Sequence, residues 1–259
     1  MNNPKISIIT ITFNSERTLE ETILSVINQE YSNLEYLIID GGSKDHTLDV
    51  VEKYRDRISF VISEPDKGIS DAFNKGIKRA TGEIIGIINS DDVLLPGALQ
   101  AVADNFEIGV DVYRGNVVIW DDIHNTKLST RPTMSFKVGT PIKAVAHQGT
   151  FVTKAAYQKF GAFRIDFRYM MDADLLYRLS AHGAVFKYID YDMALSRLGG
   201  VTSDDWKKKI PEKRKLIRVN GGNKWMEIKS IFEYVTRNII KRIGFFVFGE
   251  NISRKLRYK

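Results

Sequence analysis

The 259-residue chain contains no cysteine, which excludes disulfide frameworks, thiolate metal sites and thiol redox chemistry. It also lacks a run of the ~18 consecutive apolar residues that a membrane-spanning helix needs, since its densest apolar stretches are residues 84–88 and 245–248. The apolar start at residues 6–11 is short and includes Ser7 and Thr10, so it predicts a buried strand rather than an export signal. We therefore expect a cytoplasmic protein that does not cross a membrane.

Two glycine motifs that cradle phosphates, G-x-G-x-x-G and G-x-x-x-x-G-K-[ST], are absent as well. The composition is otherwise that of a folded protein, with 43% hydrophobic and 27% charged residues. Residues 1–205 contain 22 Lys and Arg against 28 Asp and Glu, a net charge of −6, whereas residues 206–259 contain 16 against 4, a net charge of +12. This division predicts an acidic domain over 1–205 and a basic extension over 206–259.

Short apolar runs alternate with segments of helical periodicity through the first 106 residues. The predicted strands are residues 6–11, 36–39, 58–62 and 84–88, and the helices predicted to follow them are residues 18–29, 47–54, 69–80 and 96–106. Four such units predict a Rossmann-like α/β fold with a mostly parallel sheet and helices on both faces. Beyond Asp111 we predict strands at 112–120 and 150–153, a helix at 171–181, and a last helix after a break at 220–222.

Polar residues follow each of the four predicted strands. They are T-F-N at 12–14, D-G-G-S-K-D at 40–45, S-E-P-D-K-G at 63–68 and N-S-D-D at 89–92. Ligands of open α/β sheets bind at the edge where parallel strands end, so we expect the functional site there.

Asp91 and Asp92 leave a buried strand side by side, where two carboxylates repel each other unless they are solvated, cap a helix or bind a cation. Mg²⁺ or Mn²⁺ held by one or two carboxylates and by substrate phosphates is one interpretation. The other is that Asp92 caps the helix near Pro96. The loop at 40–45 also has two interpretations. Asp40 could bond a base or a ribose, or the loop could be a turn in which Asp45 caps the next helix.

Together with F-N-K-G-I at 73–77 and Y-M-M-D-A-D-L-L-Y-R-L at 169–179, the four loops resemble the family 2 glycosyltransferases. The motifs occur in that family's order and spacing, and the resemblance fades after Gly199. It implies the GT-A fold and an inverting glycosyltransferase with a nucleotide-diphosphate sugar as donor, UDP being the favoured nucleotide. It also implies a surface polysaccharide or a lipid-linked glycan as acceptor.

The resemblance further implies a role for each matching residue. The residues implied to bind the nucleotide sugar or the acceptor are Thr12, Asn14, Asp40, Asp66, Asn74, Asn89, Ser90, His147 and Gln148. Asp91 and Asp92 match the family's D-x-D metal element, which binds Mg²⁺ or Mn²⁺, and Asp172 matches the general base. Asn89 departs from the family pattern, because an amide at the first position of the element adds no charge.

The chemistry of the reaction also favours Asp172 as a base. Displacement at an anomeric carbon needs a base for the proton of the acceptor hydroxyl, and the departing diphosphate needs a cation. Without the resemblance, Asp172 is explained as a helix N-cap, and Asp174 with Arg178 as an (i, i+4) ion pair. His147 and Gln148 are otherwise a polar turn before a strand.

The last predicted helix carries one apolar face. Its members are Trp225, Ile228, Phe232, Val235, Ile239, Ile243 and Phe246. With the Lys and Arg residues around this face, residues 223–259 suit a helix that lies on an anionic membrane surface, at the inner face of the cell membrane. The alternative is a helix packed on the domain with its charges in water. We expect no nucleic acid as a partner, because no known binding motif occurs and the acidic crevice repels phosphate.

Two other functions stay open. A sugar-1-phosphate nucleotidyltransferase also uses a metal on an α/β sheet, but it needs a Gly-rich basic loop where this chain has T-F-N-S at 12–15. A non-catalytic nucleotide- or glycan-binding protein with the same fold is favoured only by Asn89.

Overall fold

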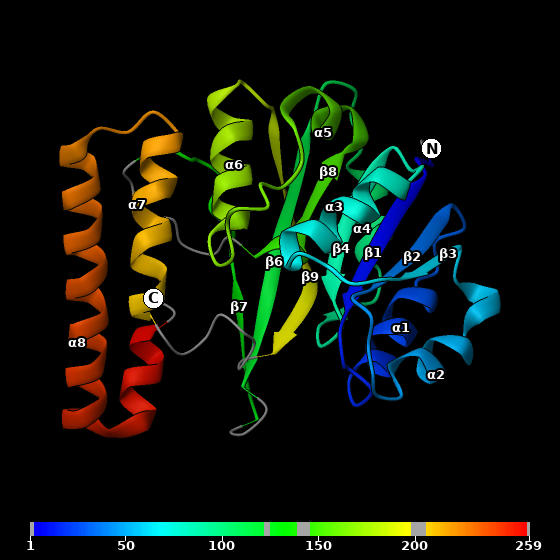
Figure 1. The fold of residues 1–259 in the computed structure, drawn as a ribbon, viewed down its shortest axis with the longest axis horizontal. Coiled ribbons are helices and arrows are strands. Elements are labelled where there is room, and N and C mark those ends of the chain that lie inside the picture. The colour runs from blue at the N-terminus through cyan, green and yellow to red at the C-terminus, as the bar shows by residue number, and fades with distance from the viewer. Residues whose placement is uncertain (1–2, 122–124, 139–145, 198–205, 258–259) are drawn as a thin grey trace.

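The first half of the chain folds into parallel strands that alternate with helices, as the sequence predicts (Figure 1). The computed structural model describes residues 3–121, 125–138, 146–197 and 206–257, without the side chains of residues 241–257. The four parallel strands are β1 (Ile6–Thr12), β2 (Leu34–Asp40), β3 (Phe60–Ser63) and β4 (Ile84–Asn89). The helices that follow them are α1 (Leu19–Ile27), α2 (Thr47–Glu52) with the 3-10 turn η1 (Arg55–Arg57), α3 (Ile69–Arg79) and α4 (Ala98–Asp104).

A second set of strands extends this sheet to nine strands within the described residues. These strands are β5 (Val93–Leu94), β6 (Val112–Asp121), β7 (Thr126–Thr130), β8 (Thr150–Thr153) and β9 (Phe186–Arg197). The order is β3-β2-β1-β4-β8-β6-β9-β5, with β7 on β6. β8 runs antiparallel to β4 and β6, so the sheet is mixed beyond β4. The predicted strands at 112–120 and 150–153 are confirmed, whereas β5, β7 and β9 were not predicted.

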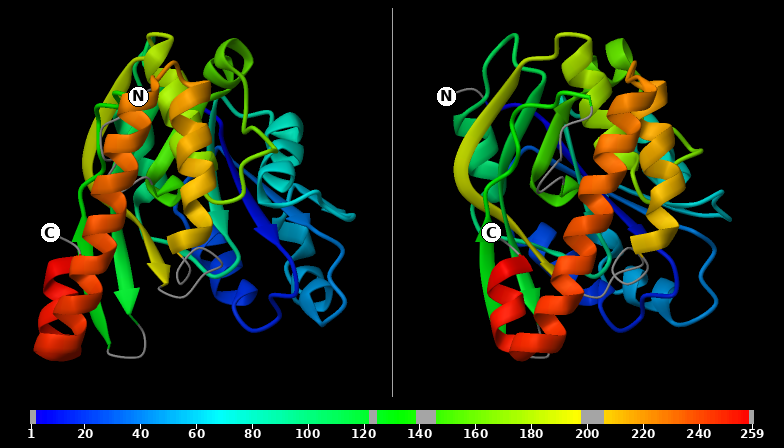
Figure 2. Two further views of the ribbon diagram at one scale, coloured as in Figure 1. Left: turned by 60° about the vertical axis from the view of Figure 1, so that its left-hand side comes forward. Right: turned by 90° about the vertical axis from the view of Figure 1, so that its left-hand side faces the viewer.

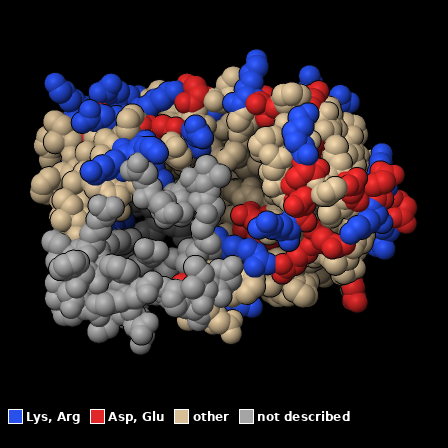
Figure 3. All heavy atoms as spheres, turned by 60° about the horizontal axis from the view of Figure 1, so that its bottom comes forward, with Lys and Arg blue, Asp and Glu red and all other residues tan. Residues whose placement is uncertain are grey.

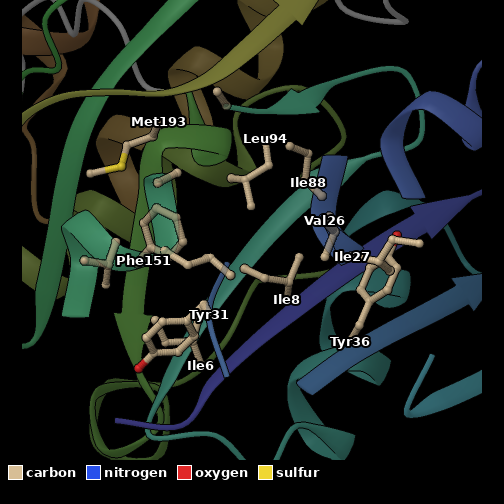
Figure 4. Packing of buried hydrophobic residues seen from close by; sticks show 14 of the residues in the cluster. Ile6, Ile8, Val26, Ile27, Tyr31, Tyr36, Ile88, Leu94, Phe151 and Met193 are labelled. Carbon is tan, nitrogen blue, oxygen red and sulfur yellow. The ribbon is translucent and has the colours of Figure 1, made fainter. Parts of the chain in front are cut away.

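Alternate residues of each strand face opposite sides of the sheet, and each side is covered by its own helices. On one side, Ile8 and Ile38 pack in a core with residues of α1 and α4 (Figure 4). On the other side, Ile9 and Leu37 pack in a second core with residues of α3, α5 (Lys154–Phe160) and α6 (Met171–Ala181). Figure 2 shows the strands passing between these layers. The sheet therefore has helices on both faces, as predicted.

Gly86 of β4 allows β8 to lie close to β4. A Cβ atom at this position would lie 2.7 Å from the ring of Phe151 and 2.8 Å from Ile8. The absence of a side chain at Gly86 leaves room for the Phe151 ring, which is fully buried in the first core. This packing brings the residues that precede β8, including η2 (His147–Gly149), next to the end of β4.

The basic extension forms the 3-10 turn η3 (Trp206–Lys208) and two helices, α7 (Lys209–Val219) and α8 (Lys224–Arg257). The boundary predicted at 205/206 falls at the end of a segment, residues 198–205, that lies outside the described residues. Pro211 lies in the first turn of α7, where a missing N–H breaks no helical hydrogen bond. The predicted break at 220–222 is confirmed.

α7 packs on the domain and α8 packs on α7 (Figure 1). Leu216 of α7 joins the second core, and Glu212 accepts hydrogen bonds from the backbone N–H groups of three consecutive residues before α6, namely Arg168, Tyr169 and Met170. α8 contributes the buried Glu227, which pairs with Arg218 at 2.7 Å. The outer helix is thus attached by an ion pair to α7 and by a ring contact between Tyr234 and Trp206 of η3.

The apolar face predicted for α8 is largely exposed in the described part of the helix, where Val235 is its only half-buried member. Trp225, Ile228 and Phe232 are 67%, 59% and 69% exposed, and Ile239 is also exposed. The side chains of Ile243 and Phe246, predicted to continue this face, lie outside the described residues. Among the described residues, no helix is both long enough and apolar enough to span a membrane.

Candidate functional site

The carboxyl ends of β1, β2 and β4 meet at one rim of the sheet, which is turned towards the viewer in Figure 3. The strand register places Thr12 beside Asp40 and Asp40 beside Ser63. Ile11 pairs with Asn89, so the turn after β4 starts in the same row. Figure 3 also shows acidic side chains gathered over the side of the molecule that contains β1–β3. Four predicted loops thus share one edge.

The Asp40 carboxylate is fully buried at the start of the loop after β2. Its oxygens accept hydrogen bonds from the backbone N–H groups of Gly42 (3.1 Å) and Ser43 (3.0 Å). They also accept bonds from the hydroxyls of Ser43 and Ser63, both at 2.5 Å. Four donors therefore hold Asp40, and in this structure the carboxylate organises the loop. Contact with a base or ribose stays a prediction.

Asn14 connects the loop after β1 to the same structure. It has a left-handed backbone with φ of 50°, which asparagine tolerates better than most residues. Its Oδ1 accepts a bond from the backbone N–H of Lys44 at 2.9 Å, and its own N–H donates to Ser43 Oγ at 2.8 Å. Thr12 Oγ1 is buried and has no hydrogen-bond partner among the described residues. Asp45 accepts bonds from the N–H and hydroxyl of Thr47, the first residue of α2, whereas the N-cap position itself is His46.

Asp66 lies against the loop after β2, whereas the side chain of Asn74 bonds to a segment away from the rim loops. A Cβ atom at Gly41 would lie 2.8 Å from Asp66 Oδ2, and Lys75 Nζ lies 2.6 Å from Asp66 Oδ1. The amide of Asn74 instead donates to the carbonyl of Phe163 at 2.8 Å and accepts from its N–H at 2.9 Å. Asn74 therefore clamps the segment before α6, and its predicted role in substrate binding stays a prediction.

The two aspartates after β4 occupy different environments. Asp92 is buried, and Oδ2 accepts bonds from Gln148 Nε2 at 2.6 Å and Asn89 Nδ2 at 3.0 Å. Burial, and then the neighbouring charge of Asp91, raise the pKa of the Asp92 carboxyl above its usual value. Asp91 is only partly buried, and its carboxylate makes no hydrogen bond or ion pair with another described residue. Its backbone carbonyl accepts a bond from Arg197 Nε at 3.1 Å.

Asp172 joins the turn after β4 through a chain of hydrogen bonds. His147 Nδ1 lies 3.0 Å from Asp172 Oδ2, and His147 Nε2 lies 3.1 Å from Asn89 Oδ1. Asn89 then donates to Asp92. Ser90 Oγ lies 2.8 Å from Ser15 Oγ, which ties the same turn to the loop after β1. The structure thus brings together residues that the sequence could place only on separate elements.

The His147 ring is enclosed between Asp172 and the ring of Phe73, whose centroid lies 5.1 Å away. Burial opposes charging of the ring, but the carboxylates of Asp172, Asp92 and Asp91 together outweigh burial, so the pKa of His147 is raised above its usual value. The Asp172 side chain is 24% exposed, but its Oδ1 atom is buried and has no hydrogen-bond partner among the described residues. A small cavity beside it is lined mainly by apolar side chains that include Tyr157 and Leu175. Asp172 therefore retains one unused acceptor oxygen, which is buried beside this cavity.

Three local alternatives can now be judged. Asp92 does not cap the helix after it, because the N-cap of α4 is Gly97. Asp172 is not an N-cap, because that position of α6 is Met170. The ion pair between Asp174 and Arg178 is confirmed, with Arg178 Nε 2.9 Å from Asp174 Oδ2.

Arg114 is a buried residue near the site that the sequence analysis did not single out. Its Nε donates to Thr150 Oγ1 at 3.1 Å, and its guanidinium lies 5.5 Å from the ring centroid of Phe136. Burial lowers the pKa of Arg114 to about 10, although the charge of Asp172 opposes this shift. The sequence feature that could have pointed to Arg114 is that it is the single charged residue within the apolar strand predicted at 112–120.

Residues 7–168 match the family model described as "Glycosyl transferase family 2". The chain belongs to this family. The match includes the four rim loops, His147 and Gln148, and it ends before Asp172. The GT-A fold that the loops led us to expect is confirmed.

Several curated proteins are similar to this glycosyltransferase chain. A GalNAc(5)-diNAcBac-PP-undecaprenol beta-1,3-glucosyltransferase of Campylobacter jejuni is 35% identical over 120 residues, which cover 45% of this chain and 39% of that protein. A cholesterol galactosyltransferase of Borreliella burgdorferi is 35% identical over 111 residues, which cover 40% of this chain and 31% of that protein. The chain thus spans well under half the length of these two relatives.

Solved structures share the fold at low sequence identity. TarS of S. aureus in complex with UDP-GlcNAc aligns with a TM-score of 0.68 and 19% identity, covering 93% of this chain and 75% of that chain. The mannosyltransferase PcManGT of Pyrobaculum calidifontis in complex with GDP-Man and Mn²⁺ gives 0.63 and 17%, covering 90% and 70%. The first alignment covers nearly the whole chain, so the shared fold extends beyond the residues matched by the family model.

The residues present fit a divalent cation held jointly with a substrate. Among the described residues no group of three His, Cys, Asp or Glu could hold a metal ion. Asp91, however, offers a partly exposed carboxylate whose oxygens bond to none of the described residues. Mg²⁺ is commonly bound by one or two carboxylates and by substrate phosphates rather than by a complete protein cage. Asp92, with its two donors, is a poorer ligand.

Proposed function

We propose that this chain transfers a sugar from a nucleotide-diphosphate sugar to a glycan acceptor with inversion at the anomeric carbon. The observation that carries the proposal is the hydrogen-bonded connection between Asp172, a carboxylate with unused acceptor capacity, and the turn that holds Asp91. A base for the acceptor and a carboxylate for the diphosphate's cation are the two groups that direct displacement requires. UDP is the favoured nucleotide.

In this proposal Asp172 accepts the proton of the acceptor hydroxyl as that oxygen attacks the anomeric carbon. The bond between the sugar and the diphosphate breaks on the opposite side, so one displacement inverts the configuration. The loops after β1 and β2 hold the nucleotide, with Thr12, Asn14, Asp40 and Asp66 at the base and ribose. Asn89, Ser90, His147 and Gln148 complete the site around the sugar and acceptor.

Mg²⁺ or Mn²⁺ held by Asp91 would neutralise charge on the departing diphosphate. The partly exposed carboxylate of Asp91 supports this assignment. Asp92 instead stabilises the turn, because its Oδ2 already accepts hydrogen bonds from Asn89 and Gln148.

The function is tested by incubating the purified chain with UDP-, GDP- and dTDP-sugars, with Mn²⁺, Mg²⁺ or a chelator, and measuring released nucleoside diphosphate. We expect one donor class to be consumed, only with metal present. The anomeric configuration of the product, read by NMR, should be opposite to that of the donor. Binding of a nucleoside diphosphate without turnover of any donor would instead favour a non-catalytic binding protein. Release of pyrophosphate from a nucleoside triphosphate and a sugar-1-phosphate would favour the nucleotidyltransferase.

We also propose that the acceptor is lipid-linked or part of a surface polysaccharide and that α8 holds the enzyme on an anionic membrane surface. One relative is named for a substrate on PP-undecaprenol and another for cholesterol, which supports a lipid acceptor. The exposed apolar residues Trp225, Ile228 and Phe232 share one face of α8, with the exposed Lys224 and Lys229 beside them. A helix with an apolar face and flanking cations binds at the headgroup level of anionic bilayers.

The membrane proposal is tested by co-sedimentation with vesicles of phosphatidylglycerol and phosphatidylcholine. We expect binding to anionic vesicles that weakens with salt, and a loss of at least tenfold in the double variant Trp225→Ala/Phe232→Ala. Ile108→Ala is the matched control, because Ile108 is a single exposed apolar residue elsewhere on the surface. Equal sedimentation of the double variant and the control would contradict the proposal.

A further inference from the structure

We propose that Glu212 of α7 is a positioning residue, which fixes the start of α6 and thereby the place of Asp172. This inference rests on the proposed role of Asp172 as the base. It gives a part in the reaction to the basic extension, which lies beyond the residues 7–168 that the family model matches.

α6 begins without a capping side chain of its own. Its N-cap residue is Met170, whose side chain accepts no hydrogen bond from the helix. Asp172 lies in the first turn of this helix. Because helix ends fray when their backbone groups lack partners, the position of Asp172 depends on what restrains the chain before the helix.

That restraint comes from the carboxylate of Glu212. Its Oε1 accepts a hydrogen bond from the N–H of Arg168 at 2.8 Å, and its Oε2 accepts bonds from the N–H groups of Tyr169 at 2.7 Å and Met170 at 3.0 Å. Hydrogen bonds to an ionised acceptor are stronger than neutral ones. The negative charge also lies at the end of α6 where the helix dipole is positive. One side chain of α7 thus fixes three consecutive residues that lead into α6.

α7 makes a second contact with the first turn of α6. Asn220, at the end of α7, donates from Nδ2 to Oδ1 of Asp174 at 3.1 Å. Asp172 therefore lies between two points that α7 restrains, Met170 and Asp174. Figure 1 shows α7 beside α6, with α8 on its outer side.

α3 restrains the same segment from the domain. Ser70 Oγ donates to the carbonyl of Phe167 at 3.1 Å, and Asn74 exchanges two hydrogen bonds with the backbone of Phe163. The chain that enters α6 is therefore fixed between α3 and α7. The contacts from α3 end at Phe167, so only α7 restrains the last three residues before α6 by side-chain hydrogen bonds among the described residues.

Glutamine at position 212 separates the carboxylate from the shape of the side chain. It keeps the length of glutamate, but its NH₂ group replaces one oxygen and would face backbone N–H groups, which are donors as well. Glu212→Gln therefore loses at least one of the three bonds. A displacement of about 1 Å at a reacting group can lower a rate by about 10²-fold.

The contact itself is tested by amide hydrogen exchange, followed by NMR on the wild type and on Glu212→Gln. Arg168 is exposed, so its amide should exchange rapidly unless it is bonded. We expect the amides of Arg168, Tyr169 and Met170 to exchange at least tenfold more slowly in the wild type than in the variant. Exchange in the wild type at the rate of an unstructured peptide would overturn the inference, and this result needs no turnover.

The positioning role is tested by kinetics. Glu212→Gln should lower kcat at least tenfold while changing the dissociation constant of UDP less than threefold. The matched control is Glu227→Gln, which loses the bonds of a buried carboxylate to Arg218 within the extension and should keep kcat within twofold. Urea denaturation of both variants shows whether each is folded under the assay conditions.

Three outcomes separate the possibilities. Retained kcat in Glu212→Gln, or an equal loss in the control, would overturn the inference if the wild type is active. If Glu212→Gln does not fold, Asn220→Ala removes only the second contact and should lower kcat at least threefold, and an unchanged kcat would overturn the inference. An inactive wild type with slowly exchanging amides would refute the proposed function and leave the contact of Glu212 established.

Discussion

Two parts of the same rim use polar side chains in opposite ways. In the β1–β3 loops (residues 12–16, 40–47 and 63–68), the carboxylate of Asp40 and the amide of Asn14 bind other parts of the protein. In the β4–α6 cluster (Asn89, Asp91, Asp92, His147 and Asp172), Asp91 and Asp172 keep oxygen atoms that the described residues do not use. Apart from the buried hydroxyl of Thr12, the first part is internally satisfied, whereas the second is not.

This difference gives the two parts of the rim different roles: the first fixes the conformation of the loops, and the second provides the reactive groups. A loop whose polar groups are satisfied keeps one conformation before a ligand arrives, which reduces the entropy lost on binding. Unsatisfied carboxylate oxygens cost stability in a resting protein and persist where they meet a substrate or a cation. We therefore expect substitutions in the β1–β3 loops to lower stability first, and those at Asp91 and Asp172 to lower activity first.

The largest effect is expected for Asp172→Asn. The amide keeps the shape of the side chain but cannot take a proton, so kcat should fall by about 10²–10⁴-fold. Calorimetry should show unchanged affinity for the nucleotide. Asp56→Asn, at an exposed position, is the control. Turnover close to that of the wild type would refute the assignment of Asp172 as the base.

A large loss of stability is expected for Asp174→Ala, two residues further along α6. Asp174 is fully buried and pairs at 2.9 Å with both Arg164 and Arg178. Removing it leaves Arg178 buried without its partner, so the free energy of unfolding should fall by about 3–5 kcal/mol. Urea denaturation measures this change. Asp166→Ala, which breaks an exposed pair with Lys215, should cost about 1 kcal/mol or less. Equal losses would show that burial does not decide the effect.

The pair Asp40→Ala and Asp91→Ala tests the comparison directly. Asp40→Ala removes the acceptor of the Gly42 and Ser43 N–H groups, so the free energy of unfolding should fall by about 1–3 kcal/mol. Asp91→Ala should change it by about 0.5 kcal/mol or less, because no bond of its carboxylate is lost. It should instead raise the Mn²⁺ concentration for half-maximal activity. Similar stability losses in both variants would remove the distinction between the two parts of the rim.

The smallest effect concerns Glu35, at the opposite end of β2 from the rim. Burial would raise its pKa, but hydrogen bonds from Ser7 and Thr81 outweigh burial and lower the pKa from 4.5 to about 2. A lowered pKa in the folded state contributes stability above the unfolded value, and this contribution is lost as pH falls from 4.5 towards 2. Urea denaturation between pH 5 and pH 3 should show a shallower loss in Glu35→Gln than in the wild type. The control, Glu30→Gln, lies at an exposed position and should keep the wild-type slope.

Local pattern predicted the first half of the fold well. The strand at 150–153 and the helix at 171–181 agree with β8 and α6 to the residue. β9 was missed because its sequence, F-K-Y-I-D-Y-D-M-A-L-S-R, mixes charged and apolar residues without a regular period. Pairing with β6, whose register shifts near Asn116, accounts for this strand. Such pairing is a tertiary contact that no window of neighbouring residues contains.

The sequence by itself determined the order of strands and helices, the polar loops at one rim and the family, because periodicity and turn residues act between neighbours in the chain. Only the tertiary structure decided that Asp92 is buried while Asp91 is accessible, and that Asn74 clamps the segment before α6. It also decided that His147 joins Asp172, 25 residues away, to Asn89, 58 residues away. Hydrogen bonds over such separations depend on how β4, η2 and α6 pack together, and packing is a property of the whole fold.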